Sequence, residues 1–246
     1  MRWLNWRVYL GTGLIGLSVV LYVVHYLVFK DPHHIFIYML GDVAFVPLEV
    51  LIVTIVIHEL LSTREKRAML KKLNMVIGAF FSEVGTRLLE TFARLDPHWE
   101  MVRRDLVLKE KLSDEEFRRL GQRVKSYKCS ISPKPADLAE LHELLLPKRP
   151  FLLALLENPN LLEHETFTDL LWAVFHLMEE LENRAEFTGL PDTDYQHLAG
   201  DIKRAYSLLI AEWLEYMKHL KDEYPYLFSL AIRTNPFDPD ASLIVK

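Results

Sequence analysis

Two long apolar stretches, separated by one short polar loop, open the chain. The first covers residues 8–29 and the second residues 35–57, and the loop between them has the sequence KDPHH. A helix of about 20 apolar residues is long enough to cross the hydrocarbon core of a bilayer. Because each stretch reaches that length, the pattern predicts a transmembrane helical hairpin, a two-helix membrane anchor over residues 1–57.

After residue 57 the pattern changes to that of an amphipathic helix. Residues 58–95 contain no proline, and apolar side chains recur there at steps of three and four: Leu70, Leu73, Ile77, Phe80, Val84, Leu88, Phe92 and Leu95. This range is expected to form one long membrane-proximal helix that continues the second span. The stripe either packs on its own domain or drives self-association, and its drift from a strict heptad favours packing on its own domain. Gly78 and Gly85 weaken this helix unless they mark close contacts with a neighbouring helix.

Residues 96–246 predict a cytoplasmic helical domain that ends in an extended tail. Ser113 and Glu116 form a capping box that starts a helix ending near Tyr127, and Pro135 starts a short Leu-rich helix. Further helices are expected over 152–156, 163–188 and 193–223, followed by a turn-rich tail from residue 235. The fold class is therefore all-α, with a transmembrane helical hairpin followed by a multi-helix bundle.

The distribution of basic residues predicts the orientation of the hairpin. Two arginines precede the first stretch, the loop holds Lys30 alone, and five basic residues follow the second stretch: Arg64, Lys66, Arg67, Lys71 and Lys72. By the positive-inside rule both termini lie in the cytoplasm, which predicts a multi-pass protein of the inner (plasma) membrane. The five basic side chains are expected to lie against anionic lipid headgroups. A cleaved signal peptide is not favoured, because the first apolar run exceeds the usual ~7–15 residues and no A-x-A-like site follows it.

Composition narrows the function classes. The net charge of −5 argues against nucleic acid as a partner. Cys129 is the only cysteine, so there is no disulfide framework and no thiolate metal site, and its thiol is expected to be structural. The sequence contains no nucleophile elbow, phosphate-binding loop or kinase signature, so no catalytic residue and no cofactor is predicted. These absences favour a binding protein over an enzyme.

Two familiar motifs are matched only in part: one lies in the wrong structural context and the other lacks a required residue. Residues 11–16 match G-x-G-x-x-G, but they lie inside the first span rather than in a βαβ unit. Thr12 and Gly16 instead form a small-xxx-small pair that lets membrane helices approach closely. His58 and Glu59 begin a zincin motif, but Ser62 occupies the position of the second histidine.

Ionisable residues inside the second stretch are candidates for function. Asp42 and Glu49 are seven residues apart, two turns along nearly the same helix face, and Pro47 between them removes a backbone donor. A charge at the bilayer centre costs about 2.5–3.5 kcal/mol on insertion scales, so Glu49 should be protonated, paired or turned toward another helix. His25 in the first stretch is a candidate partner. A packing or oligomerisation role is favoured over a role in ion or proton transfer.

Four residues of the soluble part have the types and spacing of metal ligands. His176 and Glu179 are three residues apart, and Asp194 and His197 repeat that spacing on the next predicted helix. Helical bundles build metal sites from such pairs on facing helices. Any acidic amphipathic helix also generates such pairs by chance, and the Glu-x-x-His pairs of di-iron proteins are absent.

Three segments resemble those of an uncharacterised family of prokaryotic two-span membrane proteins with a helical cytoplasmic domain. They are KLNMVIGAFFSEVG at 72–85, HLAGDIKR at 197–204 and YPYLFSLAIRTNPF at 224–237. The resemblance extends over most of the chain and implies the hairpin-plus-helical-domain architecture. It implies no activity and no catalytic residues.

Two functions remain open at the level of sequence. The first is a membrane-anchored interaction, signalling or scaffold protein, whose partners are the lipid bilayer and another protein or a second copy of itself. The alternative is an oligomeric ion- or proton-handling protein that uses Asp42 and Glu49, which requires several copies because two spans cannot enclose a pore.

Overall fold

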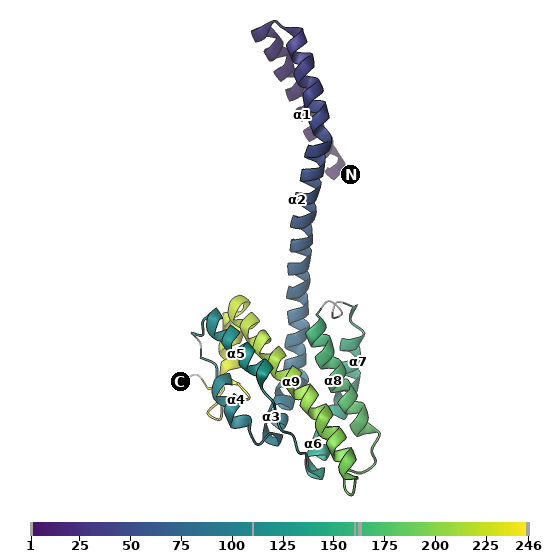
Figure 1. The fold of residues 1–246 in the computed structure, drawn as a ribbon, viewed down its shortest axis with the longest axis vertical. Helices are drawn as coiled ribbons and strands as arrows, with labels where there is room; N and C mark the ends of the chain where they lie inside the picture. The colour runs from purple at the N-terminus through teal and green to yellow at the C-terminus, as the bar shows by residue number, and fades with distance from the viewer. Residues whose placement is uncertain (1, 110, 160, 162–163, 245–246) are drawn as a thin grey trace. The chain divides into compact units, whose positions relative to one another are not determined.

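The computed structural model describes residues 2–109, 111–159, 161 and 164–244, and the regular structure in these residues is helical throughout. The all-α prediction is therefore confirmed: two long apolar helices precede a helical bundle (Figure 1). The chain divides into two compact units, the first ending at Lys66 and the second beginning at Arg67. The predicted domain limits at 57 and 95 stay a prediction.

A tight turn in the first unit joins α1 (Arg2–Phe29) to α2 (Pro32–Phe80), whose residues from Arg67 onward belong to the second unit. Lys30 occupies the left-handed region with φ of 50°, and its N–H donates to the Tyr26 carbonyl at 2.8 Å, which ends α1. Asp31 Oδ1 then accepts hydrogen bonds from the backbone N–H groups of His33 and His34 at 3.0 and 3.2 Å. These bonds cap the start of α2, because the first amides of a helix have no partner inside it.

Residues 58–95 are helical without a break, but one turn within them is π-helical rather than α-helical. After α2 ends at Phe80, a π-helical segment, η1 (Phe81–Gly85), precedes α3 (Thr86–Leu95). The Thr86 hydroxyl and amide both donate to the carbonyl of Phe81, the hydroxyl at 2.9 Å. The wider turn changes the phase of the helix, so the adjacent side chains of Phe80 and Phe81 are both buried.

The remaining helices belong to the second unit. They are α4 (Trp99–Leu106), α5 (Asp114–Ser126), α6 (Pro135–Leu145), the 3₁₀ turn η2 (Leu146–Lys148), α7 (Arg149–Leu156), α8 (Glu165–Glu182), α9 (Asp192–Glu223) and α10 (Pro225–Arg233). The capping box at Ser113 is confirmed. Helices α4 and α10 were not predicted, and α8 ends at Glu182 instead of 188 because the Asn183 side chain caps the Glu179 carbonyl at 2.8 Å.

Helix α9 is the centre of the second unit, where it packs against α3, α5, α8 and α10. Its buried side chains meet the stripe of α2 and α3, in which Leu73, Ile77 and Phe92 are almost inaccessible to solvent. The stripe thus packs on its own domain, as the drift of its pattern favoured. Gly78 marks a close contact, since a Cβ there would lie 2.9 Å from the Tyr216 hydroxyl.

The segment after α10 is held against the bundle. The Asn235 side chain donates to the Leu106 carbonyl at 2.8 Å, and the Phe237 ring lies 5.0 Å from the Trp213 ring. Both residues are buried. The tail therefore packs on the bundle at least as far as Phe237.

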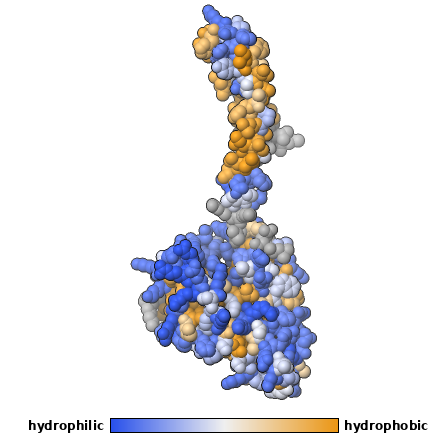
Figure 2. Space-filling view, in the orientation of Figure 1, coloured by the Kyte–Doolittle hydropathy of each residue, from blue (hydrophilic) through white to orange (hydrophobic). Residues whose placement is uncertain are grey.

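The two units differ in the character of their surfaces. Figure 2 shows apolar residues covering α1 and the N-terminal part of α2, and mostly hydrophilic residues on the visible face of the second unit. The apolar side chains of α1 from Val8 onward are about half exposed or more. The buried core of the described residues lies in the second unit.

Candidate functional site

The ionisable residues that the sequence suggests for the first unit do not pair with one another in the part of the chain that the structure describes. Asp42 and Glu49 are exposed on α2, and no hydrogen bond or ion pair of the described residues links either to His25. The half-buried His25 ring instead lies 4.8 Å from Phe29 and 6.5 Å from His34. Their role in ion or proton transfer stays a prediction.

The small-residue pair of α1 faces open space. A Cβ on Gly16 would meet no atom within 4 Å, and the Thr12 hydroxyl donates to carbonyls of its own helix, to Val8 at 2.9 Å and Tyr9 at 3.1 Å. Within the described chain this face of α1 therefore has no packing neighbour. A contact through Thr12 and Gly16 requires another molecule.

The five basic residues after the second apolar stretch lie along α2. Arg64, Lys71 and Lys72 are exposed, while the side chains of Lys66 and Arg67 lie outside the described residues. Lys71 Nζ stands 5.9 Å from the centre of the Tyr224 ring. Their contact with lipid headgroups stays a prediction.

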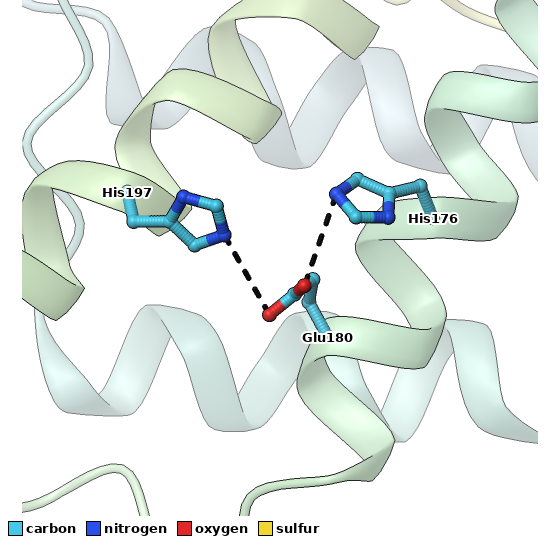
Figure 3. Close-up of side chains that lie close together, drawn as sticks. All are labelled: His176, Glu180 and His197. Atoms are coloured by element: carbon cyan, nitrogen blue, oxygen red, sulfur yellow. Dashed lines mark ion pairs between the residues drawn. The ribbon is translucent and has the colours of Figure 1, made fainter.

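Histidine and carboxylate side chains converge between α8 and α9. His176 and Glu180 come from α8, and His197 and Asp201 from α9. Figure 3 shows both imidazoles turned toward the Glu180 carboxylate. His176 Nε2 lies 3.8 Å from Glu180 Oε1 and 3.5 Å from Asp201 Oδ2. His197 Nε2 lies 3.7 Å from Glu180 Oε2 and 3.4 Å from Asp201 Oδ2. We call these four residues the α8–α9 cluster.

Local sequence explains how the cluster assembles. Each helix contributes a histidine and a carboxylate four residues later, a spacing that places both side chains on one face. A short connection returns the chain so that α9 packs against α8. Gly189 in this connection has φ of +75°, a conformation that side-chain-bearing residues rarely adopt.

Two of the four predicted metal ligands belong to this cluster and two do not. The structure brings His176 and His197 together, but Glu179 lies 3.7 Å from Arg149 and Asp194 pairs with Arg184 at 2.7 Å. The carboxylates beside the imidazoles are Glu180 and Asp201, which the sequence analysis missed. The signal that identifies them is a four-residue step from histidine to acid, present on both helices.

Each of the two carboxylates also pairs with an arginine. Arg184 donates from Nη1 to Glu180 Oε2 at 2.7 Å, and this hydrogen bond holds the pKa of Glu180 below its usual value. Arg204 Nη1 lies 3.2 Å from Asp201 Oδ1. The Asp201 side chain is only 3% exposed, and its Oδ2 atom accepts no hydrogen bond from the described residues.

The donor set defines what chemistry the cluster can support. Three of its members, His176, Glu180 and His197, have ligand atoms within 4.8 Å of one another. Imidazole nitrogen and carboxylate oxygen together suit divalent transition metals, and the cluster contains no nucleophilic hydroxyl or thiol. The single thiol, Cys129, is buried elsewhere, and burial raises its pKa, as expected for a structural cysteine.

Comparisons with known proteins identify relatives along nearly the whole chain. The family model of the MJ1433 N-terminal helical domain matches residues 2–61, and that of the C-terminal helical domain of the uncharacterised protein MJ1433 matches residues 69–233. The chain is 45% identical to the uncharacterised protein MJ1433 of Methanocaldococcus jannaschii over 233 aligned residues. The alignment covers 95% of this chain and 93% of that protein. No solved structure matches the chain. These matches confirm a family of helical proteins, and its two-span membrane character stays a prediction.

Proposed function

The chain belongs to the MJ1433 family, and we propose that it is a membrane-anchored interaction protein that holds its second unit at the cytoplasmic face of a membrane. The observation that carries this proposal is the pair of exposed apolar helices in the first unit. The helical second unit is then the part of the chain available to a protein partner.

Length and hydropathy support anchoring. The two apolar segments are Val8–Phe29, with mean hydropathy 2.0, and Pro32–Glu65, with mean hydropathy 2.3. They contain 22 and 34 residues, and each exceeds the length of a typical span. Two such helices in succession differ from a signal peptide, which has one apolar run of about 7–15 residues.

Burial supports the same conclusion. None of the residues in the most apolar window of either helix is buried, unlike those of a core helix in a soluble protein. Apolar surface exposed to water costs roughly 25 cal/mol per Å², so a continuous apolar band favours transfer into lipid. The basic residues Arg64, Lys71 and Lys72 follow this band directly, which favours a cytoplasmic location for the second unit.

An exposed apolar surface on the second unit supports a partner. Met75 of α2 and Leu227 of α10 line the same cavity of about 330 Å³, together with Tyr216 and Tyr224. Tyr226 on α10 is 71% exposed and Met75 is 61% exposed. Exposed apolar side chains beside a cavity are typical of protein contacts. We call this surface the α2–α10 groove.

Anchoring is tested by extraction and by cysteine labelling. In a Cys129→Ser background, His33→Cys reports on the loop between the apolar helices, and Gln122→Cys reports on exposed α5. A maleimide that cannot cross membranes should label His33→Cys in intact cells, and Gln122→Cys only after the membrane is opened. Alkaline carbonate should leave the protein in the pellet. Release by carbonate, or labelling of both positions in intact cells, would contradict the proposal.

Partner binding is tested by photo-crosslinking in native membranes. A photoreactive amino acid at Met75, which lines the groove, should give one reproducible adduct with another protein or a second copy, identified by mass spectrometry. Met101, which is 69% exposed on α4, is the matched control position. If Met75 gives no adduct beyond those formed at Met101, the groove is not a binding surface.

A further inference from the structure

We propose that the α8–α9 cluster holds one divalent transition-metal ion, best matched by Zn²⁺, with His176, Glu180, His197 and Asp201 as its ligands. This inference concerns the second unit alone and does not depend on whether the first unit spans a membrane. It rests on the distances within the cluster and on the buried oxygen of Asp201.

The distances between imidazole nitrogens and carboxylate oxygens exceed typical hydrogen-bond lengths and are close to the ligand–ligand distances of a metal coordination shell. Nitrogen–oxygen hydrogen bonds have a typical length of about 2.9–3.0 Å. With Asp201 Oδ2 and Glu180 Oε1 as the ligand oxygens, the imidazole–carboxylate distances are instead 3.4, 3.5 and 3.8 Å. A tetrahedral ion with ligands about 2.1 Å away places those ligand atoms about 3.4 Å apart. The ligand atoms of His176, Glu180 and His197 also lie within 4.8 Å of one another, and Asp201 Oδ2 lies beside both imidazoles, so the arrangement is compatible with one shared ion.

Asp201 supplies the observation that an ordinary surface ion pair does not explain. Its side chain is 3% exposed, and Oδ2 lies between the two imidazole nitrogens without a hydrogen bond from the described residues. A buried carboxylate oxygen that accepts no hydrogen bond is costly, since burial removes its water. A cation between the imidazoles would satisfy this oxygen.

The arginines leave one oxygen of each carboxylate for the ion. Arg204 lies beside Asp201 Oδ1, so Oδ2 is the atom that faces the imidazoles. Arg184 holds Glu180 at Oε2, and Oε1 remains on the side of His176. Hydrogen-bonded carboxylates of this kind are common around protein metal sites, where outer partners fix the orientation of the ligands.

The donor set selects the class of metal. Two imidazoles and two carboxylates suit Zn²⁺, whereas Mg²⁺ and Ca²⁺ prefer oxygen ligands alone. Four protein ligands complete a tetrahedron, which is typical of structural rather than catalytic zinc. The ion would tie α8 to α9 beside the loop that connects them.

The test uses the full-length chain in detergent, stripped with a chelator and titrated with Zn²⁺ against an indicator dye. The native chain should bind one ion with high affinity. His176→Ala, His197→Ala and Asp201→Asn should each weaken this binding by at least ~100-fold, more than the loss expected from removing an outer partner. X-ray absorption at the zinc edge should report two imidazoles with oxygen ligands.

Glu179→Gln is the matched control for Glu180→Gln. Glu179 is the neighbouring carboxylate on α8, but it lies beside Arg149, so its loss should leave zinc affinity unchanged. Zn²⁺ should raise the melting temperature of the native chain and of Glu179→Gln, but not that of Glu180→Gln. Asp201→Asn should keep the melting temperature of the stripped protein while losing the rise with zinc, which separates a ligand from a purely structural residue.

Several results would overturn the inference. They are the absence of high-affinity zinc binding, equal affinity in the native chain and in His176→Ala and His197→Ala, or equally tight binding of Mg²⁺. Loss of binding in Glu179→Gln to the same extent as in Glu180→Gln would also contradict the assigned ligands.

Discussion

Asp96 is a fully buried carboxylate that follows α3, and its hydrogen bonds join three parts of the second unit. Oδ2 accepts a hydrogen bond from the Tyr127 hydroxyl, and Oδ1 accepts from the backbone N–H groups of His98 and Ser130 at 3.0 and 3.4 Å. Burial and the bond to Asp96 raise the pKa of Tyr127 well above its usual range. This single side chain thus connects the ends of α3 and α5 with the segment that follows α5.

Tyr127→Phe should destabilise the second unit by about 1–3 kcal/mol, because a buried oxygen of Asp96 loses its donor. Chemical denaturation followed by tryptophan fluorescence measures this loss. Tyr226→Phe is the control, since that ring is 71% exposed and its change should be within about 0.5 kcal/mol. Equal effects of the two substitutions would contradict the role assigned to Tyr127.

The raised pKa of Tyr127 also predicts a dependence on alkaline pH. The folded chain retains the phenol proton to higher pH than the unfolded chain, in which tyrosine titrates near pH ~10. Its contribution is therefore fully present below pH ~10 and is lost as the pH rises further. Tyr127→Phe should lose stability less steeply in that range. The variant should still lose some stability as the pH rises, because burial also raises the pKa values of Tyr206 and Tyr216.

Substitution of Asp42 and Glu49 distinguishes the anchoring proposal from the ion-handling alternative. Under the anchoring proposal, Asp42→Asn with Glu49→Gln should insert into membranes at least as well as the native chain, because a carboxylate at the bilayer centre opposes insertion by about 2.5–3.5 kcal/mol. Proteoliposomes of either protein should show no ion flux. A flux in the native chain that the double variant loses would favour the alternative.

At the scale of elements, η1 is the segment where the path of the chain changes. Gly85 lies against the rings of Phe80 and Phe81, and a Cβ there would come within 2.7 Å of Phe81 Cδ1 and 2.9 Å of Phe80 Cε1. The Phe81 ring stacks on Tyr216 of α9 at 5.2 Å, with an angle of 13° between the planes. The absence of a side chain at residue 85 therefore lets both phenylalanines enter the core.

Gly85→Ala should destabilise the second unit by about 1–3 kcal/mol, the usual cost of overpacking a core. Gly200→Ala on α9 is the matched control, because no atom lies within 4 Å of its Cβ position, and alanine there should stabilise the helix by roughly 0.5–1 kcal/mol. The midpoints of denaturant unfolding give both values. A stabilising Gly85→Ala would show that the π-helical turn is not required for this packing.

At the scale of the whole molecule, the second unit contains its own core. Its described buried side chains include Leu73 on α2 and Phe237 after α10. A fragment that starts at Arg64 should therefore be soluble, helical and monomeric, and should unfold cooperatively. Circular dichroism and light scattering test this expectation. An aggregated or non-cooperative fragment would mean that the core needs the first unit.

The mass of the full-length protein in detergent, compared with that of the fragment, then shows which unit mediates any self-association. An oligomeric full-length chain beside a monomeric fragment would assign the contact to the first unit, where Thr12 and Gly16 form the candidate helix-packing pair. Association of the fragment itself would assign it to the second unit and make the α2–α10 groove the first surface to test.

The sequence by itself determined those features that depend on neighbours in the chain. The apolar lengths of α1 and α2 are visible without coordinates, as are the capping box of Ser113 and Glu116 and the start of α6 at Pro135. Local hydrogen bonds and backbone restrictions produce these features, so a short window of residues is sufficient to predict them. Helix α4, with eight residues, is too short to show a period. Helix α10 was missed because Pro225, which marks the end of α9, is also the first residue of α10.

Only the tertiary structure decided which side chains meet. Residues three and four positions along a helix lie about 60° and 40° from the first residue, on opposite sides of it. The choice between Glu179 and Glu180 as the neighbour of His176 therefore depends on how α8 is rotated against α9. That rotation, like the π-helical turn at Gly85, is set by how complete side chains pack across the bundle, and that packing depends on residues far apart in the sequence.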